Sequence, residues 1–280
     1  MPELPEVETV RRGLEPVLSG ARLQRVAIHR PDLRVPFPAR FVERLTGARV
    51  ASLSRRGKYL LAALDTEETL IMHLGMSGRF VVVSGDAGSA PSTPLRHAHA
   101  EFETDAGARV AFVDARRFGL MELCASKSLI THPLLAGLGR EPLSRDFDAV
   151  YLAAKVSRRR QGVKAVLLDQ TVVAGIGNIY ACEALHRARI APDTPANTLG
   201  GAALERLVKA IRAVLREAIE AGGSTLRDYA GADGAPGYFQ HRFGVYGRQG
   251  EACVTARCGG IVRRVVQAGR ATFYCPKCQT

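Results

Sequence analysis

The sequence predicts an α+β protein in which one N-terminal helix, a β domain, a helical domain and a small metal-binding module follow one another. Three observations lead to this prediction. Apolar residues recur at helical spacing over residues 4–18, short β-type runs fill the chain as far as residue 114, and helical spacing returns after residue 125. No internal repeat interrupts this order.

The first element is an amphipathic helix that starts close to the start of the chain. Its apolar stripe comprises Leu4, Val7, Val10, Leu14, Val17 and Leu18. Removal of Met1 would leave Pro2 with a free secondary amine, within a few residues of Glu3, Glu6 and Glu8. The alternative is an ordinary helix start, with proline in the first turn and acids near the positive end of the helix dipole.

The β domain is predicted from short apolar runs separated by turn residues. They cover residues 21–29, 48–56, 58–64, 69–75, 79–84, 98–104 and 109–114, and a polar Gly/Ser/Pro loop occupies residues 84–95. This spacing is typical of an antiparallel sandwich or barrel.

Helical patterns dominate the chain from residue 131 onward. Segments 131–139, 147–160 and 162–170 come first, and a glycine turn then leads into a helix beginning near Asn178. A clear stripe from Leu204 to Ile219 forms a further helix, which Gly222 and Gly223 end.

The composition is that of a globular protein with a polyanionic partner. The chain has 280 residues, of which 46% are hydrophobic and 24% charged, and a formal net charge of +12. No apolar run is long enough to span a bilayer and no signal-peptide core is present, so we expect a cytoplasmic protein without membrane contact. Nucleic acid is the first candidate partner, and a solvated basic surface is the alternative.

Four cysteines near the C-terminus predict a metal site. A C-x4-C pair and a C-x2-C pair, sixteen residues apart, comprise Cys253, Cys258, Cys275 and Cys278. Four thiolates flanking a predicted β-hairpin suit one tetrahedral, structural zinc ion, and unliganded buried cysteines are the alternative.

Glycine-containing segments supply candidate contacts to DNA. "AGIGNIY" places Asn178 where free backbone N–H groups can bind a phosphate, or where asparagine simply caps a tight turn. "HLGMSGRF" and "ARRFG" place Met76 and Phe118 near Arg116, so these side chains either enter a base stack or pack in the core.

Seven motifs, in order along residues 2–278, resemble the formamidopyrimidine-DNA glycosylase family, which are bacterial base-excision enzymes for oxidised purines. The motifs are "PELPEVET", "RRGKYLL", "HLGMSG", "ARRFG", "GIGNIYA", "PGYF" and "RATFYCPKC". The resemblance implies a β-sandwich with a flanking helix, then a helix-two-turns-helix domain with a β-hairpin zinc finger. We expect a catalytic domain over 1–124, a linker over 125–140, the DNA-binding domain with its lesion loop over 141–240, and the finger over 241–280.

The resemblance also implies a covalent mechanism. In the family the N-terminal proline attacks C1′ of the damaged nucleotide, so Pro2 would form a Schiff base that expels the base. Glu3 would be the proton donor and relay, and Glu6 would hold the terminus in place. Lys58 would serve β-elimination and bind phosphate, and Arg270 would serve δ-elimination from the finger.

Further roles follow by the same residue-by-residue comparison. Met76, Arg116 and Phe118 would fill the gap left by the flipped base. His73 and Asn178 would bind the phosphates beside the lesion, His97 and Arg159 would also contact DNA, and Lys164 would support the site. The implied partner is double-stranded DNA containing a damaged base, bound by a nucleoid-associated monomer in the cleft between the two domains.

The sequence departs from the family pattern at three positions. The first knuckle is C-x4-C instead of C-x2-C, Ala115 stands where proline is common, and Arg227 stands in the lesion loop where lysine is common. The competing hypotheses are an endonuclease VIII-like glycosylase for oxidised pyrimidines and a non-catalytic zinc-finger DNA-binding protein. The presence of Pro2, Glu3 and Lys58 argues against the second.

Overall fold

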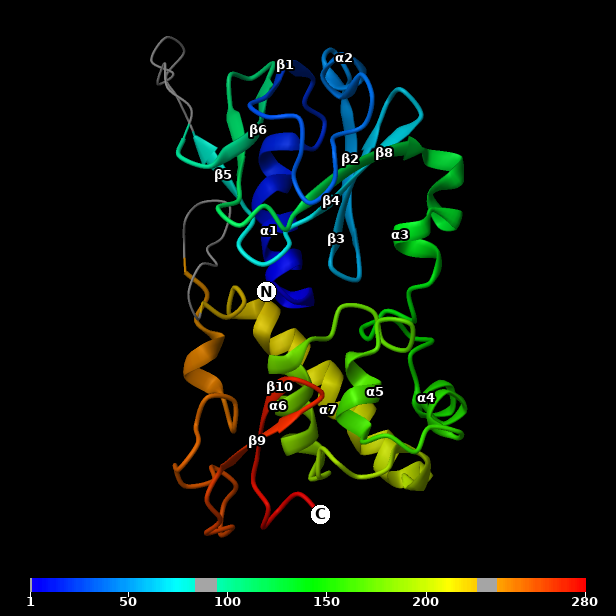
Figure 1. Ribbon diagram of the computed structural model, residues 1–280, viewed down its shortest axis with the longest axis vertical. Helices are drawn as coiled ribbons and strands as arrows, with labels where there is room; N and C mark the ends of the chain where they lie inside the picture. Colours follow the sequence, from blue (N-terminus) through cyan, green and yellow to red (C-terminus); the bar gives the residue numbers. More distant parts are fainter. Residues whose placement is uncertain (1, 84–94, 226–235) are drawn as a thin grey trace. The chain divides into compact units, whose positions relative to one another are not determined.

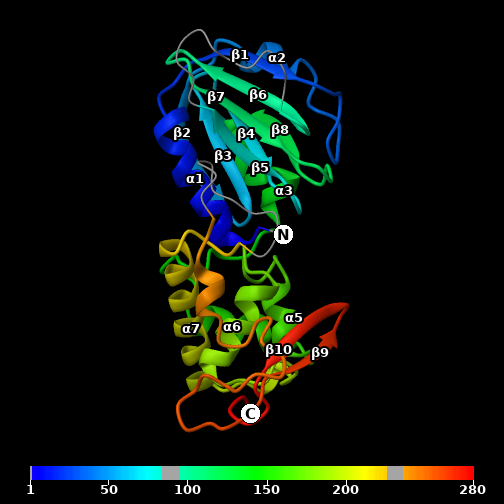
Figure 2. The same ribbon diagram turned by 90° about the vertical axis from the view of Figure 1, so that its left-hand side faces the viewer.

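The computed structural model describes residues 2–83, 95–225 and 236–280, and the chain divides into two compact units (Figures 1 and 2). Unit 1 comprises Met1–Ala136 and Gly222–Tyr238, and unit 2 comprises Gly137–Ala221 and Phe239–Thr280, each without its undescribed residues. The four segments expected from the sequence, with boundaries at 124, 140 and 240, stay a prediction.

Unit 1 contains two antiparallel four-stranded sheets, with strand orders β1-β6-β7-β5 and β2-β3-β4-β8. The strands are β1 (Leu23–Ile28), β2 (Val50–Arg56), β3 (Tyr59–Leu64), β4 (Glu68–His73), β5 (Arg79–Val83), β6 (Ala98–Thr104), β7 (Arg109–Val113) and β8 (Leu120–Ala125). Seven of them coincide with the predicted runs. Strand β8 was missed, because its short apolar segment becomes a strand only by pairing with the distant β4.

The core of unit 1 lies between the two sheets and against α1 (Leu4–Leu18), which has the bounds of the predicted stripe. Leu14 of α1 is fully buried, and the rings of Phe80 and Phe112 pack 5.2 Å apart inside the same apolar cluster. Each such buried side chain contributes about 1.5–3 kcal/mol. The fold is therefore the predicted sandwich and not a barrel. The described part of this unit also contains three short helices, α2 (Phe41–Leu45), η1 (Ser126–Thr131) and α3 (Pro133–Ala136).

Unit 2 is a helical domain followed by a β-hairpin (Figure 1). Its elements are α4 (Ala149–Val156), α5 (Val163–Leu168), α6 (Asn178–Ala188), η2 (Ala196–Thr198), α7 (Gly201–Glu220), η3 (Phe239–Arg242), β9 (Arg263–Gln267) and β10 (Arg270–Tyr274). The predicted stripe of α7 is buried and packs against α6 and α4. The α+β fold class is thereby confirmed.

The helical pattern over 131–139 produces only the single turn of α3. Gly137 and Gly139 follow at once, and glycine is a poor helix former. A Cβ at position 139 would also lie 2.3 Å from the carbonyl oxygen of Val172, so this segment is a close backbone crossing. Among the described residues, no helix combines the length and the apolar character that a bilayer crossing requires.

Candidate functional site

The start of the chain is buried against unit 1. Pro2 is buried just before α1, and Glu3 and Glu6 are only 3% and 2% exposed. One carboxylate oxygen of Glu6 accepts the backbone N–H of Glu3 at 2.8 Å, and the other accepts the N–H of Ser224 at 2.8 Å. Glu6 thus ties the first turn to a segment more than 200 residues away and fixes where Pro2 lies.

Lys58 and His73 lie side by side at one end of the second sheet. Lys58 is buried in the turn between β2 and β3, and its neighbour Tyr59 pairs with His73 across the β3–β4 ladder. Burial, together with the positive charges of Lys58 and Arg34, lowers the pKa of His73 to about 4. The backbone N–H of Gly75 donates to Nδ1 of His73 at 3.0 Å. The imidazole is therefore neutral near pH 7, with its proton on Nε2.

The loops carrying Met76 and Phe118 are in direct contact with each other. Gly75 has φ +61°, and a Cβ there would lie 2.3 Å from the carbonyl carbon of Phe118. Met76 and Phe118 are 37% and 46% exposed, which is unusual for large apolar side chains. The Arg116 guanidinium lies 4.8 Å from the centre of the Phe118 ring. The structure thus brings all three predicted gap-filling residues together on the surface and not in the core.

His97 lies at the start of β6, is exposed and has φ +64°. Few non-glycine residues occupy this left-handed region. The carbonyl oxygen of His97 accepts the backbone N–H of Asp114 at 3.0 Å, which holds this residue beside the Arg116 loop.

Asn178 begins α6 in unit 2, after a glycine turn braced by Gln170. The Gln170 side chain accepts the N–H of Gly175 at 2.8 Å and donates to the carbonyl of Ile176 at 2.9 Å. The side-chain nitrogen of Asn178 donates to the carbonyl of Ala271 at 2.8 Å, and Oδ1 of Asn178 is buried without a partner. The amide is therefore held against the strand that begins with Arg270.

Arg270 follows the tight turn of the β9–β10 hairpin and is exposed. Positive φ angles at Ala268 and Gly269 give the turn the backbone twist that two-residue hairpins need. Behind the hairpin, Nζ of the buried Lys164 donates to Oγ1 of Thr272 at 2.7 Å and to the carbonyl of Ala271 at 3.3 Å. Lys164 therefore supports the strand from which Arg270 projects.

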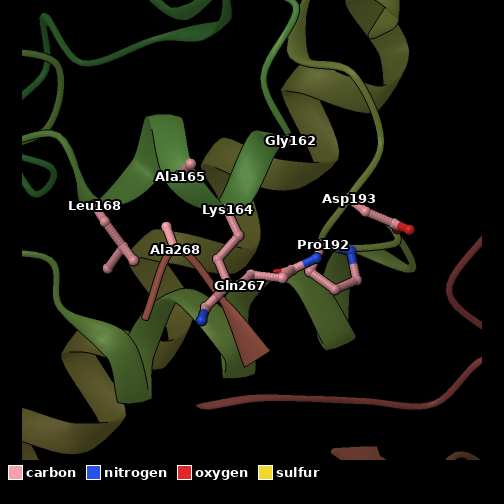
Figure 3. A pocket seen from close by; sticks show the side chains of 8 residues that line it. All are labelled: Gly162, Lys164, Ala165, Leu168, Pro192, Asp193, Gln267 and Ala268. Carbon is pink, nitrogen blue, oxygen red and sulfur yellow. The ribbon is translucent and has the colours of Figure 1, made fainter. Parts of the chain in front are cut away.

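A pocket of about 240 Å³ lies between α5 and this hairpin turn (Figure 3). It is lined by Gly162, Lys164, Ala165, Leu168, Pro192, Asp193, Gln267 and Ala268. Its volume is below the range usual for small-molecule sites. The ammonium of Lys164 already has two hydrogen-bond acceptors, so the pocket is interpreted as space beside the hairpin and not as a ligand site.

Arg159 lies after α4 and pairs with Asp169 at 2.6 Å. Burial alone would raise the pKa of the Asp169 carboxyl, but hydrogen bonds from Thr171 and Arg159 outweigh it and hold that pKa below its ordinary value. The side chain of Arg159 remains about one third exposed beside this ion pair.

The four C-terminal cysteines converge as predicted. Their sulfur atoms all lie within 4.8 Å of one another, with Cys253–Cys278 at 3.7 Å and Cys258–Cys275 at 3.6 Å. Sulfurs about 2.3 Å from a tetrahedral zinc lie about 3.8 Å apart, so the spacing fits the ion. Gly260 completes the fit, because a Cβ there would lie 2.6 Å from the sulfur of Cys275.

The wide C-x4-C knuckle closes as a turn. The N–H of Cys258 donates to the carbonyl of Thr255 at 3.0 Å, and Arg257 has φ +61°. Val254 and Arg257 point outward and are exposed. The two additional residues therefore bulge away from the sulfurs without displacing them.

Helix α6 also contacts this knuckle. Nε2 of the buried His186 lies 3.4 Å from the Cys253 sulfur and 3.3 Å from Oγ1 of Thr255. Burial would raise the pKa of the Cys253 thiol, but hydrogen bonds from Thr255 and His186 lower it to about 6. One turn earlier, the buried Glu183 accepts the N–H groups of Gly244, Val245 and Tyr246 at 2.8–3.0 Å.

The structure adds residues that the sequence did not single out. None of the sequence motifs contains Arg34, His186 or Glu183. Each can be recognised as part of a site only from the residue that it contacts in the folded chain. Arg227 of the lesion loop lies outside the described residues.

A β-sandwich with a buried chain start, a helical domain and a four-cysteine cluster are the features of a zinc-finger DNA-binding enzyme. Three protein-family models match successive parts of the chain. They are the formamidopyrimidine-DNA glycosylase N-terminal domain over residues 1–121, the H2TH domain of the same enzymes over 138–230, and the zinc finger found in FPG and IleRS over 250–280.

Similar proteins agree over their full lengths. The formamidopyrimidine-DNA glycosylases of Phenylobacterium zucineum and Cereibacter sphaeroides are 58% and 57% identical, with 100% of each chain covered. Among solved structures, a Lactococcus lactis FPG mutant bound to Fapy-dG DNA has a TM-score of 0.89 at 34% identity, with both chains covered completely. The Thermus thermophilus MutM (FPG) protein has a TM-score of 0.86 at 42% identity, with 99% of this chain and 98% of that chain covered.

The chain belongs to the formamidopyrimidine-DNA glycosylase family. It is a DNA glycosylase that acts on damaged DNA, as the sequence motifs predicted. The zinc-finger match and the four-cysteine cluster confirm the predicted structural zinc.

Proposed function

We propose that the protein excises oxidised purines from duplex DNA through a Schiff base on Pro2 and then cleaves the strand by β- and δ-elimination. The observation that carries this proposal is the anchored chain start. Pro2 is buried beside Glu3, and Glu6 fixes the turn through two hydrogen bonds of 2.8 Å. A nucleophile held in one place has less freedom to lose before it attacks.

The chemistry divides into steps with separate residues. The nitrogen of Pro2, once Met1 is removed, attacks C1′, the bond from C1′ to the base breaks, and Glu3 relays the proton lost by the amine to the departing base. Glu3 then donates a proton to O4′, the C1′–O4′ bond breaks, and the nitrogen lone pair forms the cationic iminium. The iminium acidifies C2′, so loss of that proton expels the 3′ phosphate with help from Lys58, and Arg270 assists loss of the 5′ phosphate.

DNA contacts come from both units. In unit 1, the neutral His73 donates to a phosphate, Met76, Arg116 and Phe118 fill the gap in the stack, and His97 contacts the backbone. In unit 2, Asn178 and Arg159 bind phosphates, and Lys164 supports the hairpin of Arg270. Zinc, when bound to the four cysteines, supplies the rigid mount of that hairpin and takes no part in the bond changes.

Borohydride trapping tests the covalent step. Borohydride reduces an iminium to a stable amine, so wild-type protein should become covalently attached to a duplex containing 8-oxoguanine opposite cytosine. Pro2→Gly, with a primary amine at the same place, should trap and excise far more slowly. Intact mass should show that Met1 is absent. Full excision by a protein with a blocked N-terminus would overturn the proposal.

Oxidised pyrimidines are a second candidate substrate class. A Lactococcus lactis FPG has been solved with DNA that contains an oxidised pyrimidine, at 34% identity and a TM-score of 0.88 to this chain. Parallel single-turnover assays on 8-oxoguanine and oxidised-pyrimidine duplexes separate the two classes. We expect faster excision from the 8-oxoguanine duplex. Faster excision from the oxidised-pyrimidine duplex would favour the hypothesis of an endonuclease VIII-like glycosylase.

We also propose a cytoplasmic, nucleoid-associated monomer. A net charge of +12 supports association with the nucleoid. Sedimentation with and without duplex DNA tests the oligomeric state.

A further inference from the structure

Asp114 lies directly after β7 and is fully buried. Its carboxylate accepts three hydrogen bonds. Oδ1 accepts from the Ser77 hydroxyl at 2.6 Å and from the N–H of Arg116 at 3.3 Å, and Oδ2 accepts from the N–H of Gly119 at 2.8 Å. Nothing in the proposed chemistry uses this carboxylate.

The backbone of Asp114 extends the same set of contacts. Its N–H donates to the carbonyl of His97 at 3.0 Å, and its carbonyl accepts the N–H of Arg117 at 3.2 Å and Nε2 of His99 at 2.8 Å. One residue is therefore bonded to three chain segments, namely 74–78, 95–99 and 115–119.

These three segments carry the proposed DNA-contacting loops of unit 1. Ser77 follows Met76, Gly119 follows Phe118, and Arg116 is bonded directly. None of the ion pairs found among the described residues includes Asp114. Burying a carboxylate without a neighbouring cation costs free energy unless several hydrogen-bond donors bind it. The three donors that converge on Asp114 offset this cost.

We propose that Asp114 is the positioning residue for base flipping, because it holds the Met76 loop and the Arg116–Phe118 loop in one arrangement. The inference rests on the proposed gap-filling role of those side chains. An amide replaces the carboxylate poorly, since its NH2 group would face the backbone N–H of either Gly119 or Arg116, and neither N–H can accept a hydrogen bond.

The test compares Asp114→Asn with wild type on two substrates. One is an intact duplex with 8-oxoguanine opposite cytosine, and the other carries a preformed abasic site that needs no base to be flipped. Loss of a hydrogen bond to a charged group should slow excision from the intact duplex about tenfold or more. Cleavage at the abasic site should stay within about threefold of wild type, because base loss has already occurred.

Two further variants keep the result decisive. Ser77→Ala removes a single bond to Asp114 and should shift the ratio of the two rates in the same direction by a smaller factor, even if Asp114→Asn does not fold. Glu101→Gln is the matched control, because it neutralises another buried carboxylate of unit 1, whose partners are Arg109 and His29. It should leave the ratio of the two rates unchanged.

Equal slowing on both substrates by the folded Asp114→Asn variant, or an unchanged ratio in both Asp114→Asn and Ser77→Ala, overturns the inference. Met76→Ala separates this failure from failure of the proposed function. If Met76→Ala selectively slows the intact duplex while Asp114→Asn and Ser77→Ala do not, only the role of Asp114 is wrong. If Met76→Ala also leaves the ratio unchanged, the gap-filling role itself is wrong.

Discussion

The loops of unit 1 and the zinc finger of unit 2 both carry side chains that we propose contact DNA, but the two regions are held in different ways. The loops containing Met76 and Phe118 project from a sandwich with a large apolar core, and buried polar groups fix their conformation. The finger has a small apolar cluster around Cys182, Val245 and Val262. Its order comes from four sulfurs and from polar anchors on α5 and α6.

This difference indicates where each region should fail. Removing a metal ligand from a small finger removes most of the free energy that folds it, because binding and folding are one equilibrium there. Removing a polar contact in unit 1 leaves the hydrophobic core in place and changes only the local geometry. The predictions below challenge this contrast, beginning with the largest expected effect.

Cys258→Ser should lower the zinc content well below one ion per chain. It should also weaken DNA binding by more than about a hundredfold, because the hairpin that carries Arg270 is no longer held in place. Metal analysis and a duplex-binding titration measure the two effects. Strands of unit 1 should keep their protection against hydrogen exchange. Cys124→Ser is the control, because Cys124 lies on β8 of unit 1 and is not part of the cysteine cluster. Retention of both zinc and activity in Cys258→Ser would contradict the four-cysteine assignment.

The stability of unit 1 should depend on the titration of His73. The folded imidazole has a pKa of about 4, against 6.5 for the unperturbed group. Between these pH values the unfolded state binds more protons, so the free energy of unfolding falls as the pH falls, by about 2–3 kcal/mol in total. His73→Asn keeps an acceptor for the N–H of Gly75 and removes the titration.

Hydrogen exchange of β3 and β4 amides, measured from pH 7 to pH 4, reports this change for unit 1 alone. The wild type should lose more protection than His73→Asn over that interval. Identical profiles for the two proteins would show that the buried imidazole is not the responsible group.

His186→Phe should weaken zinc binding by about tenfold to a hundredfold, the usual cost of losing an outer hydrogen bond to a metal ligand. The ring still fills the space beside Gly244, but the donor to the Cys253 sulfur is gone. Competition with a chelator measures the affinity directly. Arg187→Ala changes the residue next to His186 on α6 and removes only an exposed ion pair with Glu217 of α7, so it should leave the zinc affinity unchanged. Equal zinc affinities for His186→Phe and wild type would show that the contact is incidental.

The smallest effect concerns phosphate contacts. The logarithm of the affinity should fall linearly with the logarithm of the salt concentration, by about 0.9 per phosphate neutralised. Arg159→Ala should make this slope shallower by about 0.9, the contribution of one phosphate contact, with little change in lesion preference. Arg206→Ala, an exposed arginine on α7, is the control. A nearly flat salt response in the wild type would contradict binding to several phosphates.

The sequence predicted the elements whose pattern is local. The stripe of α1, the stripe of α7 and seven of the eight sandwich strands follow from spacings of 3.6 and 2 residues, because side chains on one face must share one environment. Cysteine spacing was enough to predict zinc, since two close thiolate pairs suit few other purposes.

The tertiary structure decided what depends on contacts between distant residues. Strand β8 exists because it pairs with β4, and Glu6 fixes the chain start because Ser224 lies beside it. The exposure of Met76 and Phe118 likewise follows from the packing of Gly75 on the neighbouring loop. The contacts on which the proposed roles of Asp114 and His186 rest are likewise made with other segments of the chain. Local periodicity contains no information about such partners, because they are chosen by how the folded core brings the loops together.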